Sequence, residues 1–223
     1  MIFQGEIQKL VLATISSFVL CARVVTAQEI VLSLIEPDGT PVSGAVMKLL
    51  SDMAVTPTST AMCEAQIDQI DKEFVPAVTT IVAGGDASFP SSDDILHHVY
   101  SFSTAKTFDT PLYGREANNE YREIFDAPGV TEIGCNIHDW MLAYIYVGES
   151  DLMAISNEES VVSLANVPPG QYRLRIWHSR LGAPQNSAEQ ELVIEAGRTE
   201  ALELTLELVR DRRVLSANRK RYR

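Results

Sequence analysis

The sequence predicts an all-β protein built from two packed sandwiches, and three observations support this expectation. Short runs of β-branched and aromatic residues recur along the chain, separated by turn-forming stretches such as Pro37-Asp38-Gly39. After an apolar run near the N-terminus, no segment keeps a helical periodicity of hydrophobic residues. The length of 223 residues allows one or two domains.

The first 27 residues are expected to form a cleavable signal peptide. Leu10–Ala22 is an apolar run that is short for a membrane span but typical of a signal-peptide core, and Lys9 precedes it. Small residues allow cleavage near Ala27. An uncleaved anchor and a lipoprotein at Cys21 are the weaker alternatives. No second run is long enough to span a membrane, so a periplasmic or secreted protein is expected.

Each β-prone run in the remainder of the chain is bounded by Gly, Pro, Asp or Ser. The expected strands cover residues 30–35, 41–50, 67–70, 74–76, 78–82, 87–89, 98–102, 123–125, 130–133, 142–147, 161–164, 172–177, 191–194 and 202–208. Residues 51–62 are rich in Ser, Thr, Pro and Ala, which indicates a connection. Residues 103–122 are polar and contain Pro and Gly, which indicates a long loop with room for a helical turn.

The charge of the chain argues against a general nucleic-acid binder. The sequence carries 18 Lys and Arg against 30 Asp and Glu, a formal net charge of -12. Affinity for nucleic acid comes largely from neutralising phosphates, which an acidic surface does poorly. The exception is a basic tail, residues 209–223, which is expected to be a solvated end; contact with an anionic surface is the alternative.

A possible metal site is the most informative feature of the sequence. Cys135, His138 and Met141 have the spacing C-x2-H-x2-M, and His97 stands upstream where a strand is expected to begin. One thiolate, two imidazoles and one thioether form the donor set of a blue-copper centre. Soft sulfur favours Cu(I) and imidazole favours Cu(II), so such a site reorganises little when one electron is exchanged.

These residues also have simpler explanations, since a lone Met is usually part of the core and His97 alone could be a surface histidine. Cys63 and Cys135 remain after signal removal, and two cysteines in an oxidising compartment suggest a disulfide. The pair C-x2-H alone could be half of a zinc site, but zinc prefers more Cys or His ligands and no Met. The chain has four histidines in all. The complete set favours one type 1 copper per chain, with Cys63 as an inert free thiol.

The surroundings of this set resemble the cupredoxins. Residues 93–99 match the pattern D-x-x-x-H-x-V, which carries the first histidine ligand in that family. The loop spacing resembles amicyanin, and residues 65–148 are similar to plastocyanin-like proteins named methylamine utilization proteins. The resemblance implies a Greek-key β-sandwich with these copper ligands: His97, Cys135, His138 and Met141.

Three neighbours are candidates for supporting the ligands: His98, Asn136 and Trp140. His98 occupies the place where plastocyanins commonly have an Asn that helps hold the ligand loop. Because side chains alternate along a strand, His98 is expected to point away from the side on which His97 lies. The resemblance therefore assigns the ligand role to His97.

The flanks of the copper module predict a second domain. Residues 36–45 and 163–174 resemble a carboxypeptidase regulatory-like, transthyretin-like sandwich. Residues 29–62 and 149–208 are expected to fold together, with the cupredoxin domain, residues 63–148, inserted between them. In the alternative, the first segment extends the cupredoxin sheet and the second folds alone. His178 is expected to be structural.

The sequence favours an exported one-electron carrier over an enzyme. A redox partner such as a cytochrome or a dehydrogenase, basic at its docking face, is expected to dock near His138, Ile137 and Trp140. A copper-handling or partner-docking protein is the alternative, although the chain has no Met-rich tract. A copper enzyme would need an open coordination position or a second copper cluster, and too few histidines remain for one.

Overall fold

The computed structural model describes residues 29–51, 62–116, 121–182 and 187–210. The segment expected to be a signal peptide, most of the expected connection at 51–62 and most of the basic tail lie outside these residues. The described residues form seventeen named strands, so the all-β expectation is confirmed. They contain no helix that is long and apolar enough to cross a membrane.

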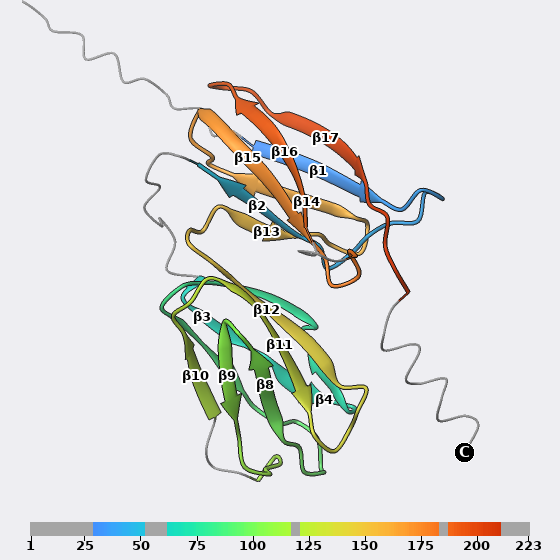
Figure 1. Ribbon diagram of the computed structural model, residues 1–223, viewed down its shortest axis with the longest axis vertical. Coiled ribbons are helices and arrows are strands. Elements are labelled where there is room, and N and C mark those ends of the chain that lie inside the picture. The colour runs from blue at the N-terminus through green and yellow to red at the C-terminus, as the bar shows by residue number, and fades with distance from the viewer. Residues whose placement is uncertain (1–28, 52–61, 117–120, 183–186, 211–223) are drawn as a thin grey trace, which may run out of the picture.

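The upper sandwich in Figure 1 is built from strands of both flanks of the sequence. Its two sheets have the orders β14-β1-β17 and β13-β2-β15-β16. The strands are β1 (Glu29–Ile35), β2 (Val46–Leu50), β13 (Met153–Ile155), β14 (Val161–Ala165), β15 (Gly170–Trp177), β16 (Ser187–Ile194) and β17 (Glu200–Thr205). β1 runs antiparallel to β14 and parallel to β17, so the first flank pairs directly with the second.

Alternation of buried and partly buried residues fixes the register of β1. Ile30, Leu32 and Leu34 are completely buried, and the residues between them are partly exposed. A strand places successive side chains on opposite faces, so this pattern directs every second residue into the core. Burying each such side chain contributes about 1.5–3 kcal/mol.

The lower sandwich is formed by the middle of the chain. One sheet has the order β10-β7-β3 and the other β6-β12-β11-β8-β9, and β4 and β5 form a separate hairpin. The strands are β3 (Glu64–Gln66), β4 (Asp68–Ile70), β5 (Glu73–Val75), β6 (Val78–Val82), β7 (Gly85–Phe89), β8 (Val99–Ser103), β9 (Lys106–Asp109), β10 (Tyr121–Phe125), β11 (Gly129–Cys135) and β12 (Leu142–Gly148). Phe89, Phe125 and Ile133 are buried between the sheets.

An aromatic cluster joins the two sandwiches. The ring of Trp177 on β15 packs against Tyr144 and Tyr146 on β12, with centroid distances of 5.4 and 5.9 Å. Buried Lys48 on β2 forms an ion pair with Glu149, which directly follows β12. The strand that leaves the ligand loop therefore ends against the other sandwich.

The expected long loop over residues 103–122 is wrong in part. β9 lies inside it and pairs antiparallel with β8, across a two-residue turn. Phe108 is the single large apolar side chain of β9, and it is buried in the lower core. One buried residue among polar neighbours is a weak strand pattern, which is why the sequence suggested a loop. The short strand β13 was likewise not expected.

Candidate metal centre

Neighbouring strands bring His97 and Cys135 together. Cys135 is the last residue of β11, and it pairs with Val99, the first residue of β8. His97 lies just before β8, in an antiparallel bridge with Tyr113. The backbone N–H of His97 donates to the Tyr113 carbonyl at 2.7 Å, and the return bond is 3.0 Å. The imidazole is thus held at the end of the sheet where β11 stops.

The remaining candidates lie on the tight loop from β11 to β12. The N–H of Met141 donates to the carbonyl of His138 at 2.9 Å, and the N–H of Cys135 donates to the carbonyl of Met141 at 3.4 Å. Met141 is 2% exposed and belongs to the same core cluster as Cys135. These bonds close the loop, so its position follows from the two strands that hold its ends.

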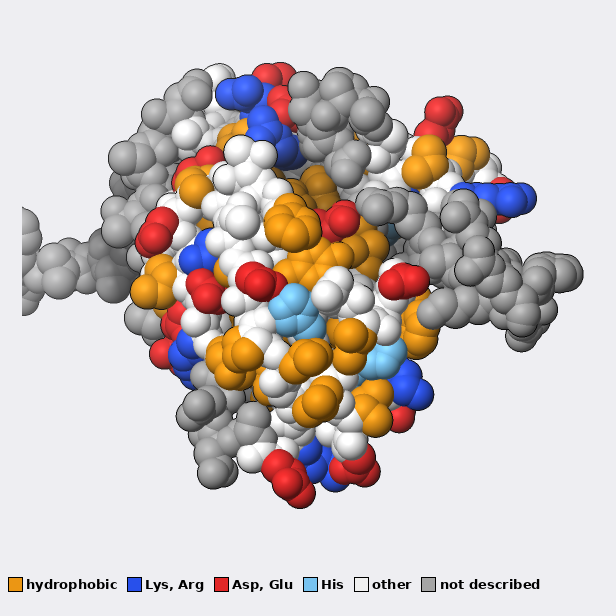
Figure 2. All heavy atoms as spheres, turned by 60° about the horizontal axis from the view of Figure 1, so that its bottom comes forward, with side chains coloured by type: hydrophobic (Ala, Val, Ile, Leu, Met, Phe, Trp, Pro, Cys, Tyr) orange, Lys and Arg blue, Asp and Glu red, His pale blue; other side chains and the backbone are white. Residues whose placement is uncertain are grey.

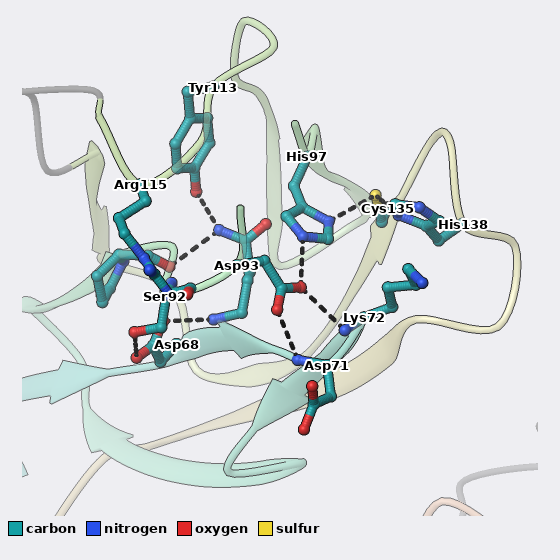
Figure 3. Close-up of polar contacts among 12 residues, drawn as sticks. Asp68, Asp71, Lys72, Ser92, Asp93, His97, Tyr113, Arg115, Cys135 and His138 are labelled. Carbon is teal, nitrogen blue, oxygen red and sulfur yellow. Dashed lines mark hydrogen bonds and ion pairs between the residues drawn. The ribbon is translucent and has the colours of Figure 1, made fainter. Parts of the chain in front are cut away.

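Three of the four candidate ligands converge. The Cys135 Sγ lies 3.8 Å from Nδ1 of His97 and 3.6 Å from Nδ1 of His138, and the three donor atoms all lie within 4.8 Å of one another. Three donors placed in a plane at about 2.0–2.3 Å from one metal ion are separated by about 3.6 Å. The spacing of these atoms therefore fits a common metal ion, and Figure 3 shows both rings beside the sulfur.

Asp93 fixes the orientation of the His97 ring. Its Oδ2 lies 2.8 Å from Nε2 of His97, the nitrogen on the far side of the ring from Cys135. A carboxylate at one ring nitrogen favours the proton there, which leaves the other nitrogen free to bind a metal. The arrangement is the one found behind metal-binding histidines, so the chain's own chemistry fits a metal site.

The environment keeps Asp93 ionised. Partial burial raises the pKa of this carboxyl, but the backbone N–H of Lys72, the His97 ring and the N–H of Asp71 donate to it. These hydrogen bonds outweigh burial and hold the pKa of Asp93 below its ordinary value. The negative charge therefore persists beside His97 at neutral pH.

The three supporting candidates lie around the site in different ways. His98 is directed to Asp109 on β9, with Nε2 2.7 Å from the carboxylate, and it is not part of the donor cluster. Its carbonyl accepts a 3.2 Å bond from the N–H of Asn136, whose side chain is exposed. The ring of Trp140 lies 5.4 Å from that of His138, and its Nε1 donates to the carbonyl of Lys72 at 3.1 Å.

The sequence did not predict two contributions. Asp93 belongs to the motif D-x-x-x-H-x-V, but its contact with His97 was not expected. The turn formed by Asp71 and Lys72 gave no recognisable pattern, because it contributes only backbone atoms. The disulfide alternative does not arise in the structure, where Cys63 is an exposed free thiol and Cys135 a buried one.

The end of the lower sandwich presents an apolar surface around the site. Figure 2 shows hydrophobic side chains gathered near histidine side chains on this face. The exposed apolar residues of the loops that carry the histidines and of the segment before Tyr113 are Ile95, Leu96, Leu112 and Ile137. His138 is partly exposed, whereas His97 is completely buried.

Comparisons with known proteins found likeness only among solved structures. No family model matches the sequence, and no curated protein does. A purple cupredoxin from Nitrosopumilus maritimus shares 20% identity over 38% of this chain and 99% of its own, with a TM-score of 0.34. Amicyanin from Paracoccus versutus shares 15% over 46% and 97%, with a TM-score of 0.35. A copper-containing nitrite reductase from Thermus scotoductus shares 23% over 54% and 28%, with a TM-score of 0.36.

The architecture follows from the strands and the cluster together. A sheet of five strands packs against a sheet of three, and the donor cluster lies at the end where β11 and β8 are paired. The chain is thus an all-β protein in which the middle of the sequence forms one sandwich, with the donor cluster at its end, and additional β-sheets accompany it.

Proposed function

We propose that the chain binds one type 1 copper ion through His97, Cys135, His138 and Met141 and carries single electrons between redox proteins. The observation that carries the proposal is that the Nδ1 atoms of His97 and His138 both face the buried thiol of Cys135. Copper, when bound, supplies reversible exchange between Cu(I) and Cu(II). The role of the protein is to hold the donor atoms so firmly that one arrangement serves both oxidation states.

The burial of the donors favours a carrier that acts on no substrate at the metal. His97 is 0% and Cys135 3% exposed, and Met141 is buried beside them. Among the three clustered donor residues, His138 alone is partly exposed. In the proposal, electrons therefore enter and leave by the exposed edge of the His138 ring.

The surface next to His138 suits a protein partner. Leu96 and Ile137 are 55% and 47% exposed at the rim of the site. The net charge of -12 favours a partner that is basic at its docking face, such as a cytochrome or a dehydrogenase, and an association rate that falls with salt. Export through the N-terminal signal peptide completes this proposal, since it would place the protein among periplasmic or secreted carriers.

We also infer that the two flanks of the sequence form one domain into which the copper module is inserted. The pairing of β1 with β14 and β17, and of β2 with β13 and β15, supports this inference. In this arrangement residues 29–62 and 149–208 make one sandwich, and residues 63–148 are inserted into it. The transthyretin-like kinship of that sandwich remains a proposal from the sequence motifs.

The proposal is tested by adding Cu(II) to the chain that begins at Gln28 and recording its visible absorption. We expect an intense thiolate-to-copper band that Cys135→Ser abolishes and that a mild reductant bleaches reversibly. Cys63→Ser is the matched control, because that thiol is exposed and lies outside the donor cluster. A weak spectrum unaffected by Cys135→Ser would contradict the type 1 site and favour the copper-handling alternative.

A further inference from the structure

The hairpin of β4 and β5 approaches the candidate site from outside the set of ligands. Its connection consists of Asp71 and Lys72, with Ile70 paired to Glu73 on either side. Both turn residues have positive φ angles, 54° and 64°. Positive φ at both central positions is typical of a two-residue type I′ hairpin turn, in which the backbone N–H groups are left available for other acceptors.

The N–H groups of this turn reach the first histidine through Asp93. Asp71 donates to Oδ1 of Asp93 at 2.7 Å, and Lys72 donates to Oδ2 at 2.9 Å. The same Oδ2 lies 2.8 Å from Nε2 of His97. Figure 3 shows the carboxylate between the turn and the ring. The turn thus fixes the carboxylate that orients His97.

The carbonyl group of the same turn reaches the loop of the second histidine. Nε1 of Trp140 donates to the carbonyl of Lys72 at 3.1 Å. The indole lies 5.4 Å from the His138 ring, at an interplanar angle of 56°. One turn therefore contacts both Asp93, which orients His97, and Trp140, which packs against His138. The two histidines come from different parts of the chain.

The hairpin is itself fixed to the segment that leads to His97. Asp68 accepts bonds from the backbone N–H and the hydroxyl of Ser92 at 3.0 and 2.6 Å. Gln69 is completely buried, and its Nε2 donates to the Pro90 carbonyl at 3.0 Å and to the Tyr113 hydroxyl at 2.7 Å. With these anchors the turn has little freedom to move relative to the site.

We propose that the turn of Asp71 and Lys72 is a positioning element that holds both histidine rings in place before any metal binds. The inference rests on the proposed copper function. Groups that orient metal ligands commonly affect metal affinity 10–100-fold, and preorganised ligands need supports that are themselves fixed. The turn acts through its backbone alone, so its side chains are replaceable where its N–H and C=O groups are kept.

The first test compares Trp140→Phe with Trp177→Phe. The first variant removes the indole N–H that reaches Lys72 and leaves a smaller aromatic ring beside His138. The second changes the other tryptophan of the chain, at the junction of the sandwiches. We expect Trp140→Phe to release copper to a chelator about ten-fold faster and to alter the electron paramagnetic resonance spectrum. Trp177→Phe lowers thermal stability but leaves both properties unchanged.

The second test acts on the turn itself. Lys72→Pro removes one N–H donor to Asp93, and proline cannot adopt the positive φ, so we expect copper release to accelerate at least about ten-fold. Lys72→Gly keeps the N–H and C=O groups and tolerates positive φ, so it retains copper as the wild-type chain does. If Lys72→Pro fails to fold, the Trp140→Phe comparison decides alone.

Failure of this inference is distinguishable from failure of the copper function. If the wild-type chain shows the Cys135-dependent band while folded Trp140→Phe or Lys72→Pro releases copper at the wild-type rate, the positioning role is overturned and the function stands. If the wild-type chain shows no such band, the function fails. The metal-free chain then tests the turn by nuclear magnetic resonance, where Trp140→Phe must broaden the His138 ring signals or the role is refuted.

Discussion

The carboxylate of Asp93 lies 2.8 Å from Nε2 of His97, on the opposite side of the ring from the thiol of Cys135. The imidazole is therefore held between a carboxylate acceptor and the thiol that is proposed to bind copper. Its Nδ1 faces the sulfur, on the side where a metal ion shared with Cys135 would lie.

The two adjacent histidines are expected to differ sharply in importance. His97→Ala removes a donor that faces Cys135, so the intense absorption band should be lost on addition of Cu(II). His98→Ala removes a ring that faces Asp109, so the band should remain. Visible spectra of both variants check this prediction. Loss of the band in His98→Ala but not in His97→Ala would reverse the assignment.

Asp93→Asn is expected to weaken copper binding about 10–100-fold. An amide offers a single acceptor oxygen, so it cannot serve the two turn N–H groups and the His97 ring as the carboxylate does. Leaving the buried Nε2–H of His97 unpaired should also lower the free energy of unfolding by about 1–3 kcal/mol.

Asp94→Asn is the matched control for Asp93→Asn. The Asp94 side chain is exposed and contacts Arg115 at the surface, so little change in copper affinity or stability is expected. Competition with a chelator and urea unfolding give the two quantities. Equal affinities for the Asp93 and Asp94 variants would refute the role of the carboxylate.

Ile137→Lys is expected to slow electron self-exchange between oxidised and reduced copies about ten-fold. The change places a hydrated charge on the apolar rim beside His138, so two copies approach each other less closely. Val193→Lys, on the exposed side of β16, adds the same charge to the other sandwich and should leave the rate nearly unchanged. Nuclear magnetic resonance line broadening in mixtures of oxidised and reduced protein measures the self-exchange rate. Equal slowing by the two variants would exclude a specific electron-exchange surface at Ile137.

Burial of Lys48 at the junction of the sandwiches makes the free energy of unfolding depend on pH in the alkaline range. Burial, with Arg175 nearby, lowers the pKa of Lys48 to about 8 despite its ion pair with the exposed Glu149, whereas the unfolded residue titrates near 10.5. Between these values the unfolded chain binds more protons than the folded chain. The free energy of unfolding therefore rises with pH in this window, by at most about 1.4 kcal/mol per pH unit.

Lys48→Met is expected to lack this rise. Urea unfolding of the metal-free wild type and variant at several pH values from about 8 to 10 isolates the contribution of Lys48, because other groups cancel in the difference. Parallel curves of unfolding free energy against pH for the two proteins would show that protonation of Lys48 is not linked to folding.

Much of the fold was predictable because burial follows residue type along most strands. The alternation in β1 directs Ile30, Leu32 and Leu34 inward, and it is visible in the sequence. The grouping of His97 with Cys135 was also predictable, since their motif places each at the end of a strand. By contrast, β9 was missed because only Phe108 among its residues is large, apolar and buried.

The supports of the site were less predictable than the site itself. The turn of Asp71 and Lys72 acts through backbone N–H and C=O groups, which every residue except proline carries, so no side-chain pattern marks it. Such turns are usually identified by an Asn-Gly pair, whereas here a lysine, Lys72, takes the second position with a positive φ. Only the tertiary packing of the hairpin against Asp93 and Trp140 reveals its place.

A redox titration of the copper-loaded chain, with absorbance and bound copper followed together, tests the proposed one-electron exchange. We expect a Cys135-dependent band that disappears on uptake of one electron per chain and returns on reoxidation, while the copper content stays unchanged. Copper lost on reduction, or a band that needs a different number of electrons, would contradict a one-electron carrier.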